Sequence, residues 1–228
     1  WDNDIMEHIV YENIDVVFSE IGNRIKVETS IGKIRKTFSL WGSSKRKFEI
    51  NYVVNMPKSI PLNLLNKYGD VFISELTSTS NIEVRYGNLK ANSIIHKEEK
   101  PLTQIILAYS KGTVEECKWT KINIKYSKIQ INKSKALVVV SKYSKVYIDE
   151  GTSVVSESKY DNYRIGNIQN FHTATAYSNL KFNEISKKLQ VESKYSDYKV
   201  ENMPSDFNKI SIENKYGSFK IGVDSKAS

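Results

Sequence analysis

Cations recur at one fixed place in this sequence, directly before a tyrosine. They are Lys67, Arg85, Lys125, Lys142, Lys159, Lys194 and Lys215. If a regular fold repeats this position, the side chains form one basic stripe, and such a stripe can bind an anionic polymer. Glutamates lie two residues before four of these cations, at Glu83, Glu157, Glu192 and Glu213. Because these acids would offset part of the charge, the mixed pattern favours a solvated face over an anion-binding rail.

The tyrosines form a second regular set, and seven of its nine members directly follow one of these cations. The nine tyrosines are Tyr68, Tyr86, Tyr109, Tyr126, Tyr143, Tyr160, Tyr177, Tyr195 and Tyr216. A row of aromatic rings can serve as a stacking platform for sugars or bases. The alternation of the flanking residues, however, points this row inward or at a corner. We therefore expect stacked core aromatics whose hydroxyls reach solvent or backbone.

The single cysteine could be a nucleophile only if it were exposed. Cys117 lies eight residues after Tyr109, and the same offset in other repeats carries Leu76, Ile94, Ile168, Ile185 and Met203. Because the equivalent residues are apolar, we expect Cys117 to be a small hydrophobic residue buried in the core. With one cysteine, the chain cannot form an internal disulfide.

Histidines and aspartates show no arrangement that suits catalysis or metal binding. The three histidines are scattered, at His8, His96 and His172. Three aspartates, Asp70, Asp161 and Asp197, share one corner of the repeat but belong to distant repeats. They lie too far apart for paired acid catalysis, so we expect them to be turn residues. The sequence predicts no catalytic residue, no metal site and no cofactor.

The spacing of the tyrosines predicts the fold. Five of them, from Tyr109 to Tyr177, recur every 17 residues. Within Trp119–Ala136, apolar residues alternate on both sides of a turn at Ser127-Lys128, which predicts two short strands. A unit this short cannot hold a βαβ crossover, so successive strands must stack about 4.8 Å apart. The prediction is an all-β, single-chain parallel β-helix of about nine coils, and the crossover rule favours right-handed winding.

The alignment on the tyrosines also predicts which side chains meet. Four residues before the tyrosine, Ile122, Val139 and Ser156 should stack in the core. Two residues before it, small polar side chains should form a hydrogen-bonded ladder; they are Asn66, Ser141, Ser158, Thr175, Ser193 and Asn214. A second turn is expected at Asn132–Ala136. The irregular segment Asn92–Leu102 explains the one long interval, and we expect it to protrude as a loop.

Residues 1–61 lack the repeat and should cap the solenoid formed by residues 62–228. Asp2–Asn13 suits a short helix, and Ile14–Glu20 with Arg24–Ile31 suits a hairpin. Lys47–Met56 alternates strongly and predicts a strand. We expect this cap to be continuous with the first coils, because an open solenoid edge invites aggregation.

Composition limits the possible partners and compartments. The net charge of +8 permits contact with anionic glycans, lipids or nucleic acid without selecting among them. The longest apolar run, Ala136–Val140, is far too short to span a membrane. A targeting segment that is removed, or that lies upstream, is consistent with a chain that begins at Trp1.

Several segments together resemble a bacterial family of unknown function that carries the label "putative adhesin". Phe48–Ile73 resembles the entry into the domain of this family, and Ile14–Gly32 is similar to its N-terminal hairpin. Its later repeats look like Arg85–Leu89, Ser141–Ser144 and Ser158–Asp161. The resemblance implies a β-helical, extracytoplasmic protein of Gram-negative bacteria, either secreted or attached to the envelope. The family offers no catalytic residues to transfer. Family members have a further strand and part of a helix upstream of the position of Trp1.

These observations favour a non-enzymatic, adhesin-like protein of the cell surface or envelope that presents an extended polar face. The expected partner is a glycan or another surface protein, and no specific nucleic acid is expected. Two alternatives stay open: a carbohydrate-active enzyme on a β-helix scaffold, and a purely structural envelope component. Acids clustered on adjacent coils would favour the enzyme.

Overall fold

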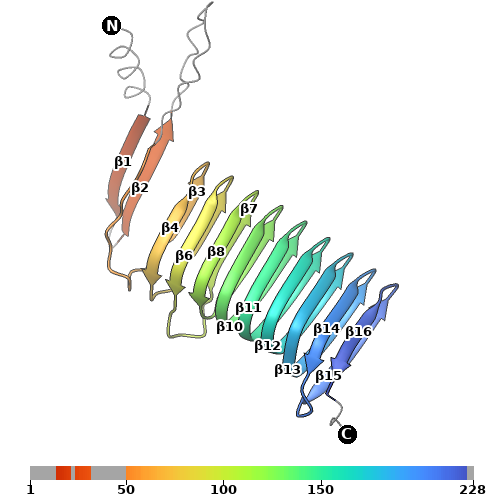
Figure 1. Ribbon diagram of the computed structural model, residues 1–228. Coiled ribbons are helices and arrows are strands. Elements are labelled where there is room, and N and C mark those ends of the chain that lie inside the picture. The colour runs from red at the N-terminus through yellow and green to blue at the C-terminus, as the bar shows by residue number, and fades with distance from the viewer. Residues whose placement is uncertain (1–13, 22–23, 32–49, 225–228) are drawn as a thin grey trace, which may run out of the picture. The chain divides into compact units, whose positions relative to one another are not determined.

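The computed structural model describes residues 14–21, 24–31 and 50–224, and every regular element within these ranges is a β-strand. The chain divides into two compact units, residues 1–53 and residues 54–228. Figure 1 labels most of the strands.

The smaller unit contains the predicted hairpin. Strands β1 (Ile14–Ile21) and β2 (Arg24–Ile31) pair antiparallel, with Ile21 opposite Arg24. The predicted strand at Lys47–Met56 is wrong for residues 50–56, which form no strand and pair with no described neighbour. Alternation alone does not make a strand, because the backbone also needs a partner edge. The predicted helix at Asp2–Asn13 lies outside the described residues, and the continuity of cap and solenoid stays a prediction.

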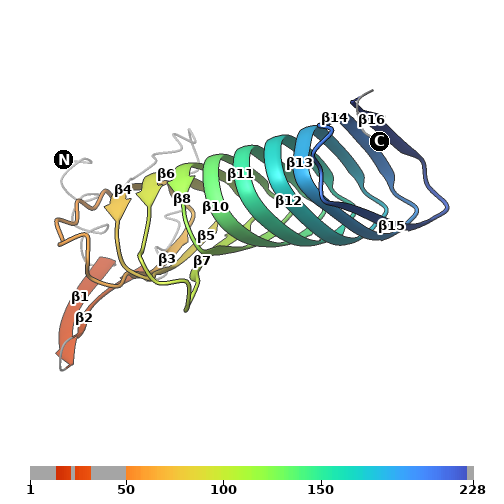
Figure 2. The same cartoon turned by 90° about the horizontal axis from the view of Figure 1, so that it is seen from below.

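The larger unit is the predicted parallel β-solenoid of about nine coils. Its described strands are β3 (Asn63–Lys67), β4 (Val71–Leu76), β5 (Asn81–Arg85), β6 (Asn88–Ile94), β7 (Thr103–Ala108), β8 (Lys111–Cys117), β9 (Thr120–Lys125), β10 (Lys128–Lys142), β11 (Lys145–Lys159), β12 (Asn162–Ala176), β13 (Asn179–Lys194), β14 (Asp197–Met203), β15 (Lys209–Lys215) and β16 (Phe219–Val223). Each pairs in parallel with a strand of a neighbouring coil, and all but the end strands β3, β4, β15 and β16 pair on both sides, so the coils lie side by side (Figures 1 and 2). The register places Val139 between Ile122 and Ser156, as predicted.

Every coil has two faces joined by two different corners. The repeat tyrosine forms a tight corner between the faces, for example at Tyr126 between β9 and β10. The opposite corner differs from the predicted turn at Asn132–Ala136, because β10 runs through it as one bent strand. A bend keeps the inter-coil hydrogen bonds that a loop would lose, which explains the length of β10 to β13. The inserted segment leaves a loop at residues 95–102 between β6 and β7.

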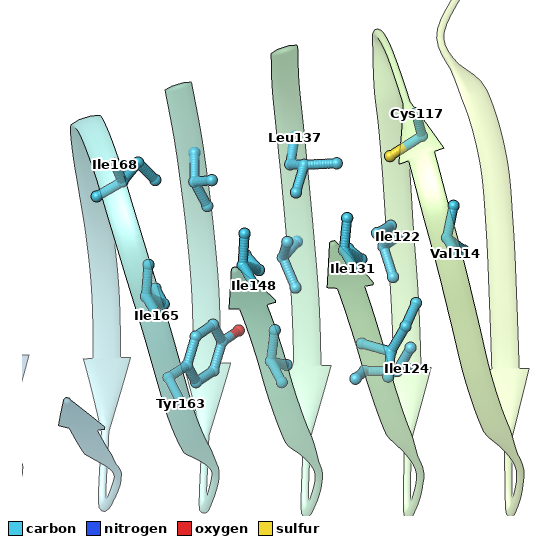
Figure 3. Packing of buried hydrophobic residues seen from close by; sticks show 14 of the residues in the cluster. Val114, Cys117, Ile122, Ile124, Ile131, Leu137, Ile148, Tyr163, Ile165 and Ile168 are labelled. Atoms are coloured by element: carbon cyan, nitrogen blue, oxygen red, sulfur yellow. The ribbon is translucent and has the colours of Figure 1, made fainter. Parts of the chain in front are cut away.

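Columns of apolar side chains from both faces fill the interior (Figure 3). Ile122, Val139, Ile131 and Ile148 are fully buried. Cys117 is also fully buried within this core, as predicted. Each of these side chains is covered by the equivalent side chains of the coils before and after it. A narrow solenoid can therefore have a core that continues along its whole axis.

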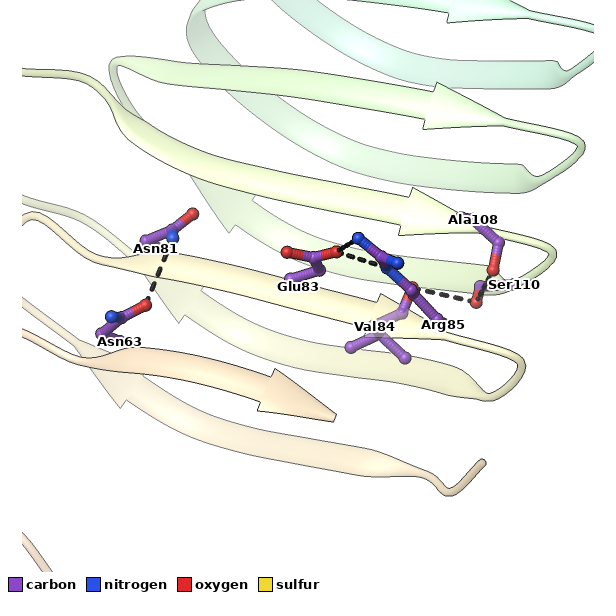
Figure 4. Close-up of polar contacts among 7 residues, drawn as sticks. All are labelled: Asn63, Asn81, Glu83, Val84, Arg85, Ala108 and Ser110. Carbon is purple, nitrogen blue, oxygen red and sulfur yellow. Dashed lines mark hydrogen bonds and ion pairs between the residues drawn. The ribbon is translucent and has the colours of Figure 1, made fainter. Parts of the chain in front are cut away.

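A ladder of serines lines the inside of the tyrosine corner. The backbone N–H of Ser110 donates to Ser127 Oγ at 3.0 Å, and that of Ser127 donates to Ser144 Oγ at 3.2 Å. Each hydroxyl in turn donates to a carbonyl two residues earlier, as Ser110 does to Ala108 at 2.8 Å (Figure 4). The buried corner backbone is thereby satisfied, which a sharp turn inside a core requires. The predicted polar ladder beside it is confirmed at Ser158–Thr175 and Ser193–Asn214.

Candidate functional site

The repeat tyrosines form an exposed ladder along one edge of the solenoid. Neighbouring rings lie 4.9–5.1 Å apart between centroids, with interplanar angles of 2–15°. Tyr143 is 41 % exposed, and the end residues Tyr68 and Tyr216 are 71 % and 78 % exposed. The prediction that these are core aromatics is therefore wrong. The rings do stack, but outside the core.

The backbone at each tyrosine explains this difference. Of the described residues, ten non-glycine residues have positive φ, and nine of them are these tyrosines, at 50–63°. A residue with a left-handed backbone conformation breaks the alternation of a strand. The side chain of Tyr143, which would otherwise follow Lys142 back to the core side, therefore stays outside. This conformation costs a residue with a Cβ about 1–2 kcal/mol. Ring stacking offsets that cost, since an aromatic pair contributes about 0.5–1.5 kcal/mol beyond its buried area.

The ladder cannot be a stacking platform for sugars or bases along its length. The faces of an interior ring such as Tyr143 are covered by the rings of Tyr126 and Tyr160 at 5.0 and 4.9 Å. A ligand ring would have to separate the stack to enter. The nine tyrosines are nevertheless 40–78 % exposed, so their uncovered edges face the solvent and this surface can offer hydrogen bonds at a regular spacing.

The seven predicted cations do line up beside the tyrosine ladder. All seven are exposed, and strand pairing brings Lys125 next to Lys142 and Lys142 next to Lys159. Ala108 and Ala176 occupy the same column and separate the cations into groups.

The glutamates neutralise the stripe less than the sequence suggested. Arg85 forms an ion pair with Glu83 (Figure 4), and Lys215 approaches Glu213 at 3.6 Å. Within the described part of the chain, Lys125, Lys142 and Lys159 form no ion pair. Their ammonium groups lie over the rings of the following tyrosines instead, with Nζ 5.5, 5.2 and 5.4 Å from the ring centroids. These three lysines keep their full charge at the surface, since a cation–π contact does not neutralise an ammonium group.

Together the nine tyrosines and the seven cations form a surface that we call the tyrosine–lysine edge. Its repeat is the distance between coils, and its middle carries three adjacent charges without acidic partners. Exposed like charges at this spacing repel each other by only about 1 kcal/mol in water. The edge is therefore stable without a ligand, but an extended anion along it would relieve that repulsion.

A second polar surface lies on the face that follows the tyrosine corner, built from the first halves of β10 to β13 and from β14. It contains an open groove of about 570 Å³ whose lining includes Lys128, Tyr147, Arg164 and Lys181. No prediction from the sequence included this surface. Its signal was present four residues after the repeat tyrosine, where Tyr147, Arg164, Lys181 and Lys199 follow one another in register.

A buried polar network replaces one serine of the corner ladder. Asp161 is 2 % exposed and accepts hydrogen bonds from Ser141 Oγ at 2.8 Å, Ser144 N at 2.6 Å and Lys159 N at 2.9 Å. Burial raises the pKa of the Asp161 carboxyl, although these hydrogen bonds act to lower it. Ser141 also bonds the buried hydroxyl of Tyr163 at 2.6 Å. Solvent does not reach this network, which makes it structural.

The remaining candidates are not assembled into a reactive centre in the described part of the chain. Burial raises the pKa of the Cys117 thiol to about 12, which disfavours the reactive thiolate. His96 is buried and contacts the Trp119 carbonyl at 3.2 Å, while His172 lies exposed on a distant coil. Asp70 and Asp197 each bond the next coil's corner backbone, as expected of turn residues.

Among the described residues, no group of three or more histidine, cysteine, aspartate or glutamate side chains could hold a metal ion. The same residues include no helix with the length and apolar character needed to cross a membrane.

Comparisons of this chain with protein-family models, with curated proteins and with solved structures found no match. The resemblance to the adhesin-labelled family therefore stays a prediction.

Proposed function

We propose that this protein is a non-enzymatic, adhesin-like binding protein that uses the tyrosine–lysine edge to hold an extended acidic polysaccharide. The observation that carries the proposal is the row of Lys125, Lys142 and Lys159, three adjacent cations with no acidic partner in the described structure, beside a regular row of tyrosine hydroxyls. A linear ligand can follow such an edge across several coils.

The chemistry of the edge favours a polymer over a small molecule. The edge is an exposed corner of the coils, so it cannot enclose a small ligand, whereas pockets for small molecules bury most of their ligand. Many weak contacts repeated along a polymer can still give firm binding, because each further contact is made at a high effective concentration. Ammonium groups attract carboxylates or sulfates, and tyrosine hydroxyls can bond sugar hydroxyls.

Catalysis on this scaffold has less support. A glycosidase needs two carboxyl groups about 5–10 Å apart that are open to substrate. The buried Asp161 is inaccessible, and Asp70 and Asp197 lie several coils apart and are engaged with backbone. The proposed site of action is the cell surface or envelope, as the family resemblance implies. A purely structural envelope component is the alternative, and it requires no ligand at the edge.

A glycan array tests the proposal. The parent protein should retain acidic polysaccharides and fail to retain neutral ones. The variant Lys125→Ala/Lys142→Ala/Lys159→Ala should lose most of this binding, with a free energy of unfolding nearly unchanged because exposed charges contribute about 0–1 kcal/mol each.

The matched control removes three exposed lysines away from the edge, Lys90, Lys133 and Lys188. This control has the same net charge as the edge variant, so it should keep the binding if position matters more than total charge. Equal retention of acidic polysaccharides by the parent and the edge variant would overturn the proposal and favour the structural alternative.

A further inference from the structure

The groove on the face around the corner from the tyrosine–lysine edge has the features of a separate ligand site. Its lining crosses five adjacent coils, from Lys128 and Gln130 on β10 to Glu201 on β14. Strand pairing sets Tyr147, Arg164 and Lys181 directly beside one another in consecutive coils. Neighbouring coils are about 4.8 Å apart, so the groove is elongated along the solenoid axis.

A glycine creates the hollow. Most coils carry a polar side chain six residues after the repeat tyrosine, as Asp149 and Asn183 do, but the coil between these two carries Gly166. A Cβ at Gly166 would lie 2.2 Å from the carbonyl oxygen of Asp149, so the close approach of the two coils requires glycine. The missing side chain leaves a depression between Asp149 and Asn183, with Arg164 and Lys181 in the neighbouring column beside it.

Most polar groups around the groove are already held in place by other side chains. Lys128 lies over the Tyr147 ring at 4.8 Å, and Asn183 donates to Asn167 Oδ1 at 2.7 Å. Glu201 forms an ion pair with Lys199. These contacts restrict the side chains concerned before a ligand arrives, which lowers the entropic cost of binding.

Two cations in the groove lack such a partner. Within residues 14–21, 24–31 and 50–224, no carboxylate forms an ion pair with Arg164 or Lys181, and both side chains are exposed. They stand in adjacent coils and repel each other. An arginine guanidinium binds a planar carboxylate or a sulfate through two parallel hydrogen bonds, and a neighbouring ammonium adds charge without a geometric demand.

We propose that this groove is a saccharide-binding site that recognises a carboxylate or sulfate group on a short stretch of an acidic glycan. Arg164 and Lys181 bind the anionic group. The carboxylate of Asp149 and the amides of Gln130 and Asn183 bond the sugar hydroxyls, and the Tyr147 ring flanks the chain.

The acidic side chains of the lining argue against a nucleic acid. Asp149 and Glu201 would repel a phosphodiester backbone, whereas a carboxylate readily accepts hydrogen bonds from sugar hydroxyls. Lys128 covers a face of Tyr147, which hinders base stacking on that face. A ligand rich in hydroxyls with spaced negative groups fits this mixture better than a uniform polyanion.

The site is independent of the tyrosine–lysine edge, and separate variants can test the two surfaces. The probes are a short oligogalacturonate, a short sulfated oligosaccharide, a neutral oligosaccharide and a single-stranded oligodeoxynucleotide, each titrated by calorimetry. We expect the parent to bind at least one of the acidic oligosaccharides and not the neutral one. A preference for the first or the second acidic probe identifies the group as carboxylate or sulfate.

The variant Arg164→Ala/Lys181→Ala should weaken this binding at least tenfold. Arg164→Lys should give an intermediate loss, because it keeps the charge and removes the paired hydrogen bonds. The control Lys90→Ala/Lys220→Ala removes two cations from the same column outside the groove and should bind like the parent. The Lys125/Lys142/Lys159 variant should also keep this binding, because the short probes cannot make the many repeated contacts that hold a long polysaccharide along the edge. Failure at the edge is therefore distinguishable from failure at the groove.

Three results would overturn the proposal. The first is equal affinity of the parent and the Arg164/Lys181 variant for the acidic oligosaccharides. The second is no binding of either acidic probe by the folded parent. The third is tighter binding of the oligodeoxynucleotide than of both acidic saccharides, which would assign the groove to nucleic acid.

Discussion

Two opposing free energies act at each tight corner: ring stacking stabilises it, and the left-handed backbone destabilises it. Variants of Tyr143, in the middle of the tyrosine ladder, can measure the two separately. The Tyr143 ring stacks on two neighbours at 5.0 and 4.9 Å, and Lys142 lies 5.2 Å from its centroid. Two stacking contacts are worth about 1–3 kcal/mol and the cation–π contact about 0.5–1 kcal/mol. Tyr143→Ala should therefore lower the free energy of unfolding by about 2–4 kcal/mol.

Tyr143→Gly removes the same contacts but should be less harmful than the alanine variant. The backbone at Tyr143 has φ 52°, which glycine adopts without the steric cost that any Cβ incurs. We expect the glycine variant to be more stable than the alanine variant by about 1 kcal/mol. In an ordinary strand the order would be reversed, because glycine there loses about 0.5–1 kcal/mol relative to alanine.

Urea unfolding followed by circular dichroism measures both variants against the parent. Tyr68→Ala is the control, because Tyr68 stacks on Tyr86 alone among the described residues and is 71 % exposed, so its loss should be clearly smaller. An alanine variant at position 143 as stable as the parent, or more stable than the glycine variant, would refute the account of the corner.

Three further predictions concern the interior. Val139→Asp should destabilise the fold by several kcal/mol, because it loses about 1.5–3 kcal/mol of burial and adds an unpaired buried charge; an unchanged thermal midpoint would contradict the core assignment. Cys117 should react slowly with a thiol reagent in the native protein and rapidly in denaturant, and fast native labelling would reject its burial. Asp161→Ser, which restores the serine of the corner ladder, should gain stability relative to the parent as pH rises. The raised pKa of Asp161 means that its favourable contribution is present below its unfolded pKa and is lost as pH rises through the higher folded pKa. Urea unfolding of parent and variant at several pH values checks this, and a relative gain on acidification would contradict it.

The period and the alternation of the sequence predict most of the solenoid. Ile122, Val139 and Ser156 meet as expected because identical spacing in successive coils leaves only one register that buries all the apolar columns. The same reasoning correctly places Cys117 in the core. The reasoning succeeds because every coil has the same spacing of buried and exposed positions.

The sequence fails where the backbone departs from a regular strand. The tyrosines lie outside the core because of their positive φ, and the residue type gives no sign of this, since glycine or asparagine is the usual occupant of that conformation. The strand predicted through Tyr52 is absent because no described strand pairs with it. The groove depends on Gly166, whose missing side chain matters only once the neighbouring coils are in place.

The salt dependence of polysaccharide binding tests the central proposal most directly. The affinity of the parent for a polyuronate should fall steeply as salt rises, because exposed charges are screened beyond about 8 Å at physiological ionic strength. The Lys125/Lys142/Lys159 variant should bind weakly at low salt and show a much flatter dependence. The same affinity and the same slope for parent and variant would contradict the assignment of the tyrosine–lysine edge as a binding surface.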